Sequence, residues 1–220
     1  MRKIITTTFV TMDGVMQAPG GPEEDPSNGF KWGGWTFNYW DELMGGAMNE
    51  FMSQPFDLLL GRRTYEIFAA HWPYIKNDPI ADKFNSTSKY VVSHHQIDLT
   101  WHNSRLVTGK VVDELKKLKQ EKGNDLWVHG SGNLIQTLLK NELVDKMYMW
   151  IFPLTIGKGK KLLAEGVLAK AWKLTESRPS TTGVIIASYE PAGEIKPGSF
   201  AMEEPTKAEI TRREKLAKES

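Results

Sequence analysis

The 220-residue chain contains no cysteine, which excludes disulfide bonds and thiolate chemistry. It also has no excess of either charge, because 28 lysines and arginines face 27 aspartates and glutamates, giving a formal net charge of +1. No overall field therefore draws the chain to nucleic acid or to an anionic membrane. Apolar runs of membrane-spanning length and a signal-peptide core are both missing, so we expect a cytoplasmic protein without nucleic-acid or membrane partners.

Hydrophobic residues make up 40% of the sequence, enough for one core in a single domain. Apolar runs that suit strands alternate with segments whose apolar residues recur at helical spacing. The last two predicted strands flank a turn at Arg178-Pro179-Ser180 and form an antiparallel hairpin. The pattern predicts strands at residues 3–12, 57–60, 89–93, 126–128, 144–152, 170–177 and 182–190, and helices at residues 39–53, 63–72, 80–86, 111–121 and from 134 onward.

A glycine-rich junction follows the strand Leu126-Trp127-Val128, where Gly130, Ser131 and Gly132 lead into a helix. Such a junction aims free backbone N–H groups and the positive end of a helix dipole at one point, which suits a phosphate. The absence of a Cβ at glycine lets the backbone approach that phosphate closely. The alternative is a tight turn without a ligand.

A second junction follows the strand at residues 57–60 and carries arginine at the helix start, in Gly61, Arg62, Arg63 and Thr64. The dipole disfavours cations at that end of a helix, and an anionic ligand would offset this. The alternative is that both arginines are solvated surface residues. Together the two junctions predict a dinucleotide with an extra phosphate, and NADPH fits that description.

Residues 17–38 form a long segment without periodicity, rich in glycine and proline. Loops of this length inside a compact domain are more often functional than idle. Trp35 and its aromatic neighbours could form a lid over a substrate, or they could hold the loop to the core.

The helix predicted at residues 39–53 presents one apolar stripe that includes Trp40 and Met44. Asp41 lies on the flank of that stripe and is the best local carboxylate. It is either a weak catalytic candidate or a solvated flank residue.

Several segments, taken in order, resemble the dihydrofolate reductase-like superfamily, and above all stand-alone relatives of the reductase domain of the bifunctional riboflavin-biosynthesis deaminase–reductase. The similarity extends over residues 1 to about 190. The matching segments are Val10-Thr11-Met12-Asp13-Gly14, Leu60-Gly61-Arg62-Arg63-Thr64-Tyr65-Glu66, Lys89-Tyr90-Val91-Val92-Ser93, Val128-His129-Gly130-Ser131-Gly132-Asn133-Leu134 and Pro153-Leu154-Thr155-Ile156-Gly157-Lys158-Gly159.

The resemblance implies an α/β fold with a mixed, mostly parallel sheet, helices on both faces and an antiparallel hairpin at one edge. It implies NADPH as cofactor and hydride transfer to a small heterocyclic or ribosyl substrate. The adenosine-side phosphates would be bound by Gly61, Arg62, Arg63 and Thr64 together with Ser93. The pyrophosphate would be bound by Gly130, Ser131, Gly132, Asn133 and Leu134. The nicotinamide would meet Val10, Asp13 and Gly14, and the substrate would meet Asp13, Trp35, Trp40 and Met44.

Three functions stay open at this stage. The first is a riboflavin-type reductase, similar to 5-amino-6-(5-phosphoribosylamino)uracil reductase. The second is a reductase of folate or of another small molecule, but the position that holds the pterin-binding acid in dihydrofolate reductase matches Gly45, which argues against folate. The third is an NADP-binding regulatory protein without catalysis. No general acid is evident beyond the weak candidates Asp13 and Asp41.

Three remaining features complete the expectations. The basic loop at residues 157–161 could supply counter-ions to a phosphorylated substrate, or be solvated. His94, His95 and His102 lack partners with ligand spacing, so we expect no metal. We divide the chain into a reductase domain, residues 1–192, and a C-terminal extension, residues 193–220, whose polar helix begins near Lys207 and either frays or packs on the second subunit of a homodimer.

Overall fold

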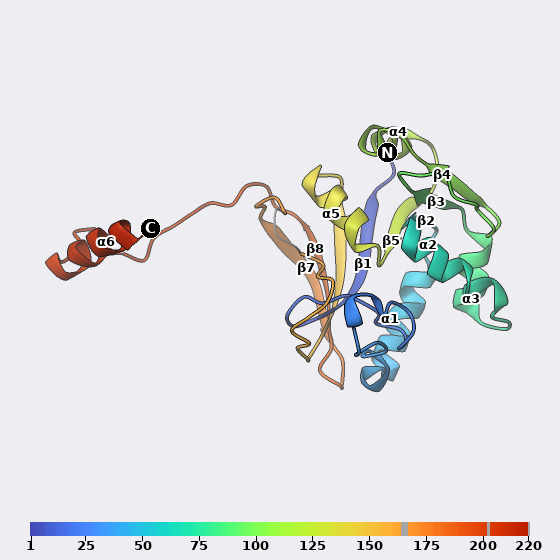
Figure 1. Ribbon diagram of the computed structural model, residues 1–220, viewed down its shortest axis with the longest axis horizontal. Helices are drawn as coiled ribbons and strands as arrows, with labels where there is room; N and C mark the ends of the chain where they lie inside the picture. The colour runs from blue at the N-terminus through green and yellow to red at the C-terminus, as the bar shows by residue number, and fades with distance from the viewer. Residues whose placement is uncertain (164–166, 202, 220) are drawn as a thin grey trace.

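The computed structural model describes residues 1–163, 167–201 and 203–219. Its centre is a twisted eight-stranded sheet with the strand order β4-β3-β2-β5-β1-β6-β8-β7 (Figure 1). The strands are β1 Ile4–Thr11, β2 Phe56–Gly61, β3 Lys89–Val92, β4 Ser104–Val107, β5 Asp125–His129, β6 Lys146–Phe152, β7 Trp172–Pro179 and β8 Ile185–Pro191. The helices are α1 Glu42–Ser53, α2 Arg62–Ala69, α3 Pro79–Ser86, α4 Val111–Gln120, α5 Gly132–Lys140 and α6 Lys207–Glu219, with short 3-10 turns at Ser27–Gly29, Phe37–Tyr39 and Trp72–Tyr74.

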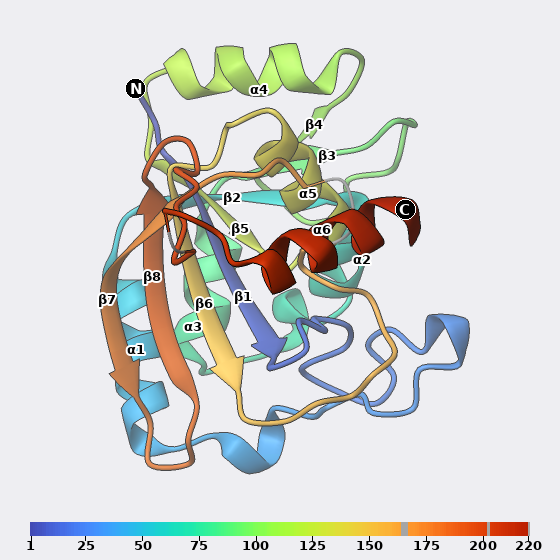
Figure 2. The same cartoon turned by 90° about the vertical axis from the view of Figure 1, so that its left-hand side faces the viewer.

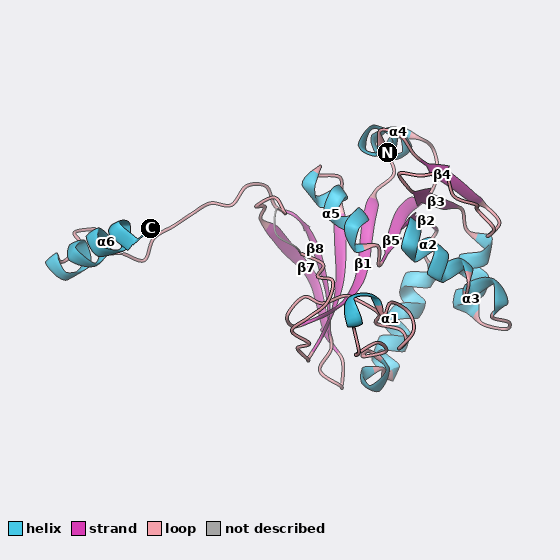
Figure 3. Cartoon of the chain, in the orientation of Figure 1, coloured by secondary structure: helices cyan, strands magenta, loops and turns pink. Residues whose placement is uncertain are grey.

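The sheet is mostly parallel. β1 pairs in parallel with β5 and β6, and β2 pairs in parallel with β3 and β5, while β3 pairs in parallel with β4. β8 runs antiparallel to both β6 and β7 and closes the sheet with a hairpin at one edge (Figure 3). The predicted fold class is therefore confirmed.

Helices cover both faces of the sheet, and in Figure 2 α5 lies in front of the strands while α1 and α3 lie behind them. On one face, α4 and α5 bury their apolar stripes against β1, β2, β5 and β6, with Leu115 and Leu138 fully buried. On the other face, α1, α2 and α3 contribute Met52, Tyr65 and Phe84 to a second, aromatic core. Leu58, Leu59 and Leu60 of β2 are completely buried because this central strand is covered on both sides.

The hairpin and the first helices differ in detail from the sequence prediction. Arg178 and Pro179 still belong to β7, and the turn lies at residues 180–183, because Ser180 N–H donates to the Val184 carbonyl at 2.7 Å. α1 begins at Glu42, three residues later than predicted, and α2 ends at Ala69 before a separate 3-10 turn that contains Pro73. The sequence analysis missed β4, a four-residue strand at the sheet edge with little apolar pattern.

A buried ion pair joins the start of the chain to β2. Arg2 is 2% exposed, and its guanidinium pairs with Asp57 while its Nε donates to the Asn124 carbonyl at 2.5 Å. Removing one partner of a buried pair leaves an uncompensated charge. We predict that Asp57→Ala lowers the free energy of unfolding by about 3 kcal/mol in chemical denaturation.

The exposed Arg105–Glu121 pair, 3.8 Å apart, provides the matched control for that experiment. Glu121→Ala should change the free energy of unfolding by less than about 1 kcal/mol. Equal effects of the two substitutions would contradict a stabilising role for the buried pair.

The C-terminal extension leaves the sheet after β8. In Figure 1 the chain runs away from the hairpin, and α6 lies apart from the sheet and its helices. No residue of α6 is buried, which agrees with the thin apolar stripe in its sequence. Within the described residues, no helix is both long and apolar enough to cross a membrane.

Candidate active site

A large cavity of about 1510 Å³ opens at the carboxyl ends of the parallel strands. Ligands of open α/β sheets bind at this end, because the loops and helix N-termini that follow the strands converge there. Ten of the residues predicted to bind the cofactor line this cavity. They are Gly61, Arg62, Arg63, Thr64, Ser93, Gly130, Ser131, Gly132, Asn133 and Leu134. The order of β2 and β5 in the sheet, side by side, brings the two predicted junctions together.

The two junctions are linked by one hydrogen bond. Ser131 precedes α5 with φ +60°, and its Oγ accepts from the backbone N–H of Gly61, at the start of α2, at 3.0 Å. Ser131 therefore does not cap its own helix, and neither α2 nor α5 has a side-chain cap at its N-terminus. The first N–H groups of both helices have no intrahelical acceptors, so both helix ends offer donors and positive dipole to an anion in the cavity.

Glycine is required in the turn before α5. Gly130 has φ +60°, a conformation that side-chain-bearing residues rarely adopt. A Cβ at Gly132 would lie 3.1 Å from the Met16 sulfur. Glycine thus permits the turn at Gly130 and leaves room for the Met16 side chain against the start of α5.

The arginines at the start of α2 differ in their contacts. Arg62 donates to Glu66 at 2.8 Å in a half-exposed pair, whereas Arg63 forms no ion pair within the described part of the chain. Ser93 lies at the end of β3, where its Oγ donates to the His95 carbonyl at 2.8 Å and accepts from the His95 N–H. Ser93 therefore shapes the turn beside the arginines.

Five predicted nicotinamide and substrate contacts lie outside the cavity, which are Val10, Asp13, Gly14, Trp35 and Met44. Val10 is 1% exposed because its side chain faces the core under α5, and Met44 is completely buried against Trp150 and Phe152. Gly14 and Trp35 do not line the cavity either. In their place the wall contains Thr7, Phe9 and Met16, and Trp40 also lines the cavity.

Asp13, the first catalytic candidate, holds two loops together instead. Its carboxylate accepts from Thr11 Oγ1 at 2.5 Å, from the Ile156 N–H at 3.2 Å and from the Gly157 N–H at 2.8 Å. The hydrogen bond from Thr11, together with those backbone donors, lowers the pKa of Asp13. Its contacts and its place outside the cavity give Asp13 a structural role and do not support one as proton donor.

Asp41, the second candidate, caps α1. One carboxylate oxygen accepts from the Met44 N–H at 2.8 Å, and the other accepts from both N–H and Oγ1 of Thr181 at 2.7 Å. These bonds, that of the Thr181 hydroxyl first, lower the pKa of Asp41. Asp41 therefore joins the start of α1 to the turn between β7 and β8, a contact that the sequence alone did not indicate, and it does not line the cavity.

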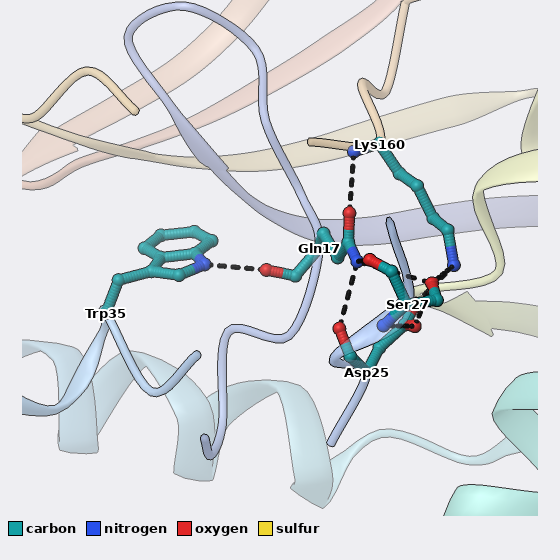
Figure 4. A network of polar contacts seen from close by, with 5 residues as sticks. All are labelled: Gln17, Asp25, Ser27, Trp35 and Lys160. Carbon is teal, nitrogen blue, oxygen red and sulfur yellow. Dashed lines mark hydrogen bonds and ion pairs between the residues drawn. The ribbon is translucent and has the colours of Figure 1, made fainter. Parts of the chain in front are cut away.

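The long loop at residues 17–38 is held by a polar network (Figure 4). Trp35 Nε1 donates to the Gln17 carbonyl at 2.8 Å, and the Trp35 ring packs edge-on against Phe152. Of the two alternatives for Trp35, the geometry is that of an anchor to the core. The part of the loop that lines the cavity is residues 17–25 without residue 22, which carry no aromatic side chain.

The same network includes Lys160 of the basic loop at residues 157–161. Lys160 Nζ contacts Asp25 at 2.5 Å and Ser27 Oγ at 2.9 Å, while the Lys160 N–H donates to Gln17 Oε1 at 3.0 Å (Figure 4). Its ammonium is therefore neutralised by Asp25, and the pKa of Asp25 is lowered by these contacts although burial opposes the shift. Lys160 thus fixes the loop at residues 17–38 at the edge of the cavity. It is not a free counter-ion for a phosphate.

His129 also lines the cavity, although its place in the segment Val128 to Leu134 predicted no role for it. It ends β5 directly before Gly130, and its ring lies among Phe56, Phe84 and Trp127. Burial lowers the pKa of His129 to about 4 from an ordinary 6.5, so the imidazole is neutral near pH 7. Its position, one residue before the glycine turn, was the feature of the sequence that could have indicated a place in the cavity.

The depressed pKa of His129 predicts a pH-dependent stability. Because the folded pKa lies below the unfolded one, the stabilisation is complete above pH 6.5 and is lost as the pH falls toward 4. The contribution is about 3 kcal/mol at most. Urea titrations of the wild type and His129→Leu from pH 7 to pH 4 should show a smaller loss of stability in the variant, and parallel curves would contradict the prediction.

The order of the strands and the helices on both faces are those of the dihydrofolate reductase-like fold. The chain belongs to the RibD C-terminal domain family, whose model matches residues 2–186. The Bacillus subtilis proteins YyaP and YwjB are 27% and 24% identical to it, over 86% and 74% of this chain and 94% and 84% of theirs.

Solved structures agree in fold. A putative riboflavin biosynthesis protein from Shewanella sp. PV-4 matches with a TM-score of 0.62 and 22% identity, over 86% of this chain and 98% of that one. Dihydrofolate reductase from Enterococcus faecalis, complexed with NADP(H), matches with a TM-score of 0.57 and 12% identity, over 86% and 96% of the two chains. A pyrimidine reductase-like protein from Corynebacterium diphtheriae matches with a TM-score of 0.59 and 9% identity, over 89% and 93%.

Proposed function

We propose that the protein is an NADPH-dependent reductase of the riboflavin-biosynthesis type, acting in the cytoplasm on a small heterocyclic or ribosyl substrate. The observation that carries this proposal is the pair of uncapped helix N-termini, α2 and α5, that meet in one cavity beside Arg62 and Arg63. The family supports it, and the fold is one that binds NADP(H) in the Enterococcus faecalis neighbour.

In this proposal each junction binds one anionic part of the cofactor. The N–H groups at the start of α5, Gly132 to Leu134, bind the pyrophosphate, which the turn at Gly130 admits. Arg62, Arg63 and Thr64 bind the phosphate on the adenosine ribose, where arginine's planar donors suit phosphate geometry. The cofactor supplies the hydride, and the chain orients it and excludes water.

The substrate side lies between β1, β5 and the helices α1, α2 and α3. Its lining is largely aromatic, and the carboxylates that line the cavity, Glu23, Glu24, Asp25 and Asp113, come from the loop at residues 17–38 and from α4. Gly45 stands where a pterin-binding acid would be expected, and Asp41 is fully engaged. We therefore favour a riboflavin-type ring over folate, with water as the proton source.

Turnover tests the proposal. Purified full-length protein should oxidise NADPH in the presence of 5-amino-6-(5-phosphoribosylamino)uracil and form the ribitol product. NADPH binding without oxidation on this substrate, on dihydrofolate or on a panel of carbonyl compounds would favour the non-catalytic regulatory alternative. Failure of NADPH to bind would overturn both.

We also propose a homodimer in which residues 193–220 contribute to the interface. The supporting observation is that α6 lies apart from its own domain, with no buried residue. Size-exclusion chromatography of the full chain and of residues 1–192 tests this. The shortened chain should elute as a monomer, and a shortened chain that stays fully dimeric would contradict the role of the extension.

A further inference from the structure

Helix α1 contains two consecutive glycines in its interior, Gly45 and Gly46. Within a helix, each glycine lowers the equilibrium constant for helix formation by roughly fivefold relative to alanine, because its backbone loses more conformational freedom on ordering. Two of them side by side in a 12-residue helix are unfavourable for its stability. Stability therefore does not account for the pair.

Neither the backbone conformation nor the available space requires glycine here. Both residues lie in regular helix, and neither has a positive φ. Beyond the adjoining helix backbone, a Cβ at Gly45 would have only Trp40 Nε1 near it, at 3.9 Å, and a Cβ at Gly46 would have no atom of the described residues within 4 Å. By contrast, a Cβ at Gly33 would lie 2.5 Å from the Gly21 carbonyl oxygen. The property of glycine that remains in use in α1 is its flexibility.

The two halves of α1 on either side of the glycines are held by different contacts. At the N-terminal end, the Asp41 carboxylate accepts from the N–H and Oγ1 of Thr181 in the β7–β8 turn, both at 2.7 Å. In the C-terminal half, the Phe51 ring packs edge-on against Tyr148 of β6 and Trp127 of β5, with ring centroids 4.5 and 5.7 Å apart. The glycines thus lie between two anchored segments, where a bend moves one segment relative to the other.

Residues on both sides of the glycines line the cavity. Trp40 precedes α1, and Met48 and Met52 belong to its C-terminal half. The Trp40 ring is stacked on Trp150 at 5.9 Å, whereas Met48 is only partly buried. Methionine side chains are flexible and repack readily. A bend at the glycines therefore changes the width of the cavity between Trp40 and Met48.

We propose that Gly45 and Gly46 form a hinge in α1 that opens the substrate side of the cavity. Substrate enters and leaves by bending of this helix, while the loop at residues 17–38 stays fixed by the network around Gln17 and Lys160 (Figure 4). The open form is a minor state, and its population sets the apparent affinity for substrate. This hinge rests on the proposed function for the identity of its substrate.

Gly46→Ala tests the hinge, because Gly46 is exposed and does not line the cavity. Alanine should raise the melting temperature of the full-length protein, since it restores helix propensity. It should also lower kcat/KM for 5-amino-6-(5-phosphoribosylamino)uracil by about fivefold, because the open state becomes rarer in the same proportion. The affinity for NADPH, which binds at α2 and α5, should stay within about twofold of the wild-type value.

Asn49→Ala is the matched control, since Asn49 is exposed on the same helix and its replacement also raises helix propensity. It should raise the melting temperature without changing kcat/KM. A stabilised Gly46→Ala variant with wild-type kcat/KM, or equal kinetic effects of the two substitutions, would overturn the hinge. A changed elution volume of Gly46→Ala in size-exclusion chromatography would overturn it too, because glycine would then serve close packing against a second copy.

Amide exchange separates the hinge from the proposed function. In the wild type, amides of residues 46–50 should exchange at least about 10-fold faster than those of residues 135–139 in α5, and low concentrations of urea should not alter their rate, as expected for local opening. A wild type that does not oxidise NADPH with this substrate would contradict the proposed function, and fast exchange at residues 46–50 would leave the hinge standing. Slow, urea-dependent exchange there would overturn the hinge whether or not the protein turns over.

Discussion

Replacing Asn133 with Asp is expected to stabilise the fold and to weaken NADPH binding at the same time. Asn133 is exposed at the first turn of α5 and lines the cavity. A carboxylate there interacts favourably with the helix dipole, by about 0.3–1 kcal/mol. The same charge repels a pyrophosphate bound at this helix end by about 1–3 kcal/mol, which corresponds to a roughly 5- to 150-fold loss of affinity.

The opposite signs make this substitution informative. Thermal denaturation gives the stability, and a calorimetric titration gives the affinity for NADPH. Thr137→Asp is the control, since Thr137 lies one turn further along the same helix. It should weaken NADPH much less, and an Asn133→Asp variant with unchanged affinity would show that the pyrophosphate does not bind at α5.

The second large effect is expected from the paired substitution Arg62→Ala and Arg63→Ala. If these residues bind the adenosine-side phosphate, the double variant should lose roughly 10- to 100-fold in affinity for NADPH and little in affinity for NADH. The preference for NADPH would then largely disappear. Competition titrations with both nucleotides on the wild type and the variant provide the measurement.

Arg105→Ala is the matched control for the arginine pair, because Arg105 is an exposed arginine on β4 outside the cavity. Its removal should leave both affinities unchanged. If the double substitution weakened the binding of NADH and NADPH equally, the two arginines would contact a part of the cofactor other than the adenosine-side phosphate.

The junctions were predictable from the sequence because they depend on local rules. A strand, a glycine turn and a helix start follow one another within a few residues, as in Val128 to Leu134, and parallel strands bring their carboxyl ends to one edge. The sequence analysis could not derive from spacing alone that β2 and β5 are neighbours. That adjacency, and with it the bond from Gly61 to Ser131, came from the fold.

The roles of the two acids were not predictable, since both depend on partners far away in the sequence. Asp13 meets the Gly157 N–H, and Asp41 meets Thr181, across 144 and 140 positions. From the neighbouring sequence alone, each residue is a carboxylate near the predicted substrate site. In the folded chain, both carboxylates accept hydrogen bonds from backbone N–H groups. His129 was overlooked for a related reason, because its burial is produced by Phe56 and Phe84 from other elements.

Hydrogen–deuterium exchange of the full-length protein with and without NADPH tests the central claim most directly, because it reports on the backbone N–H groups that are said to bind the phosphates. We predict that NADPH protects peptides covering residues 61–65 and 130–135, and that NADH protects the first of these less than NADPH does. A peptide covering residues 104–107 should be unaffected. Protection that is absent from both junctions, or confined to other segments, would contradict an NADPH site between α2 and α5.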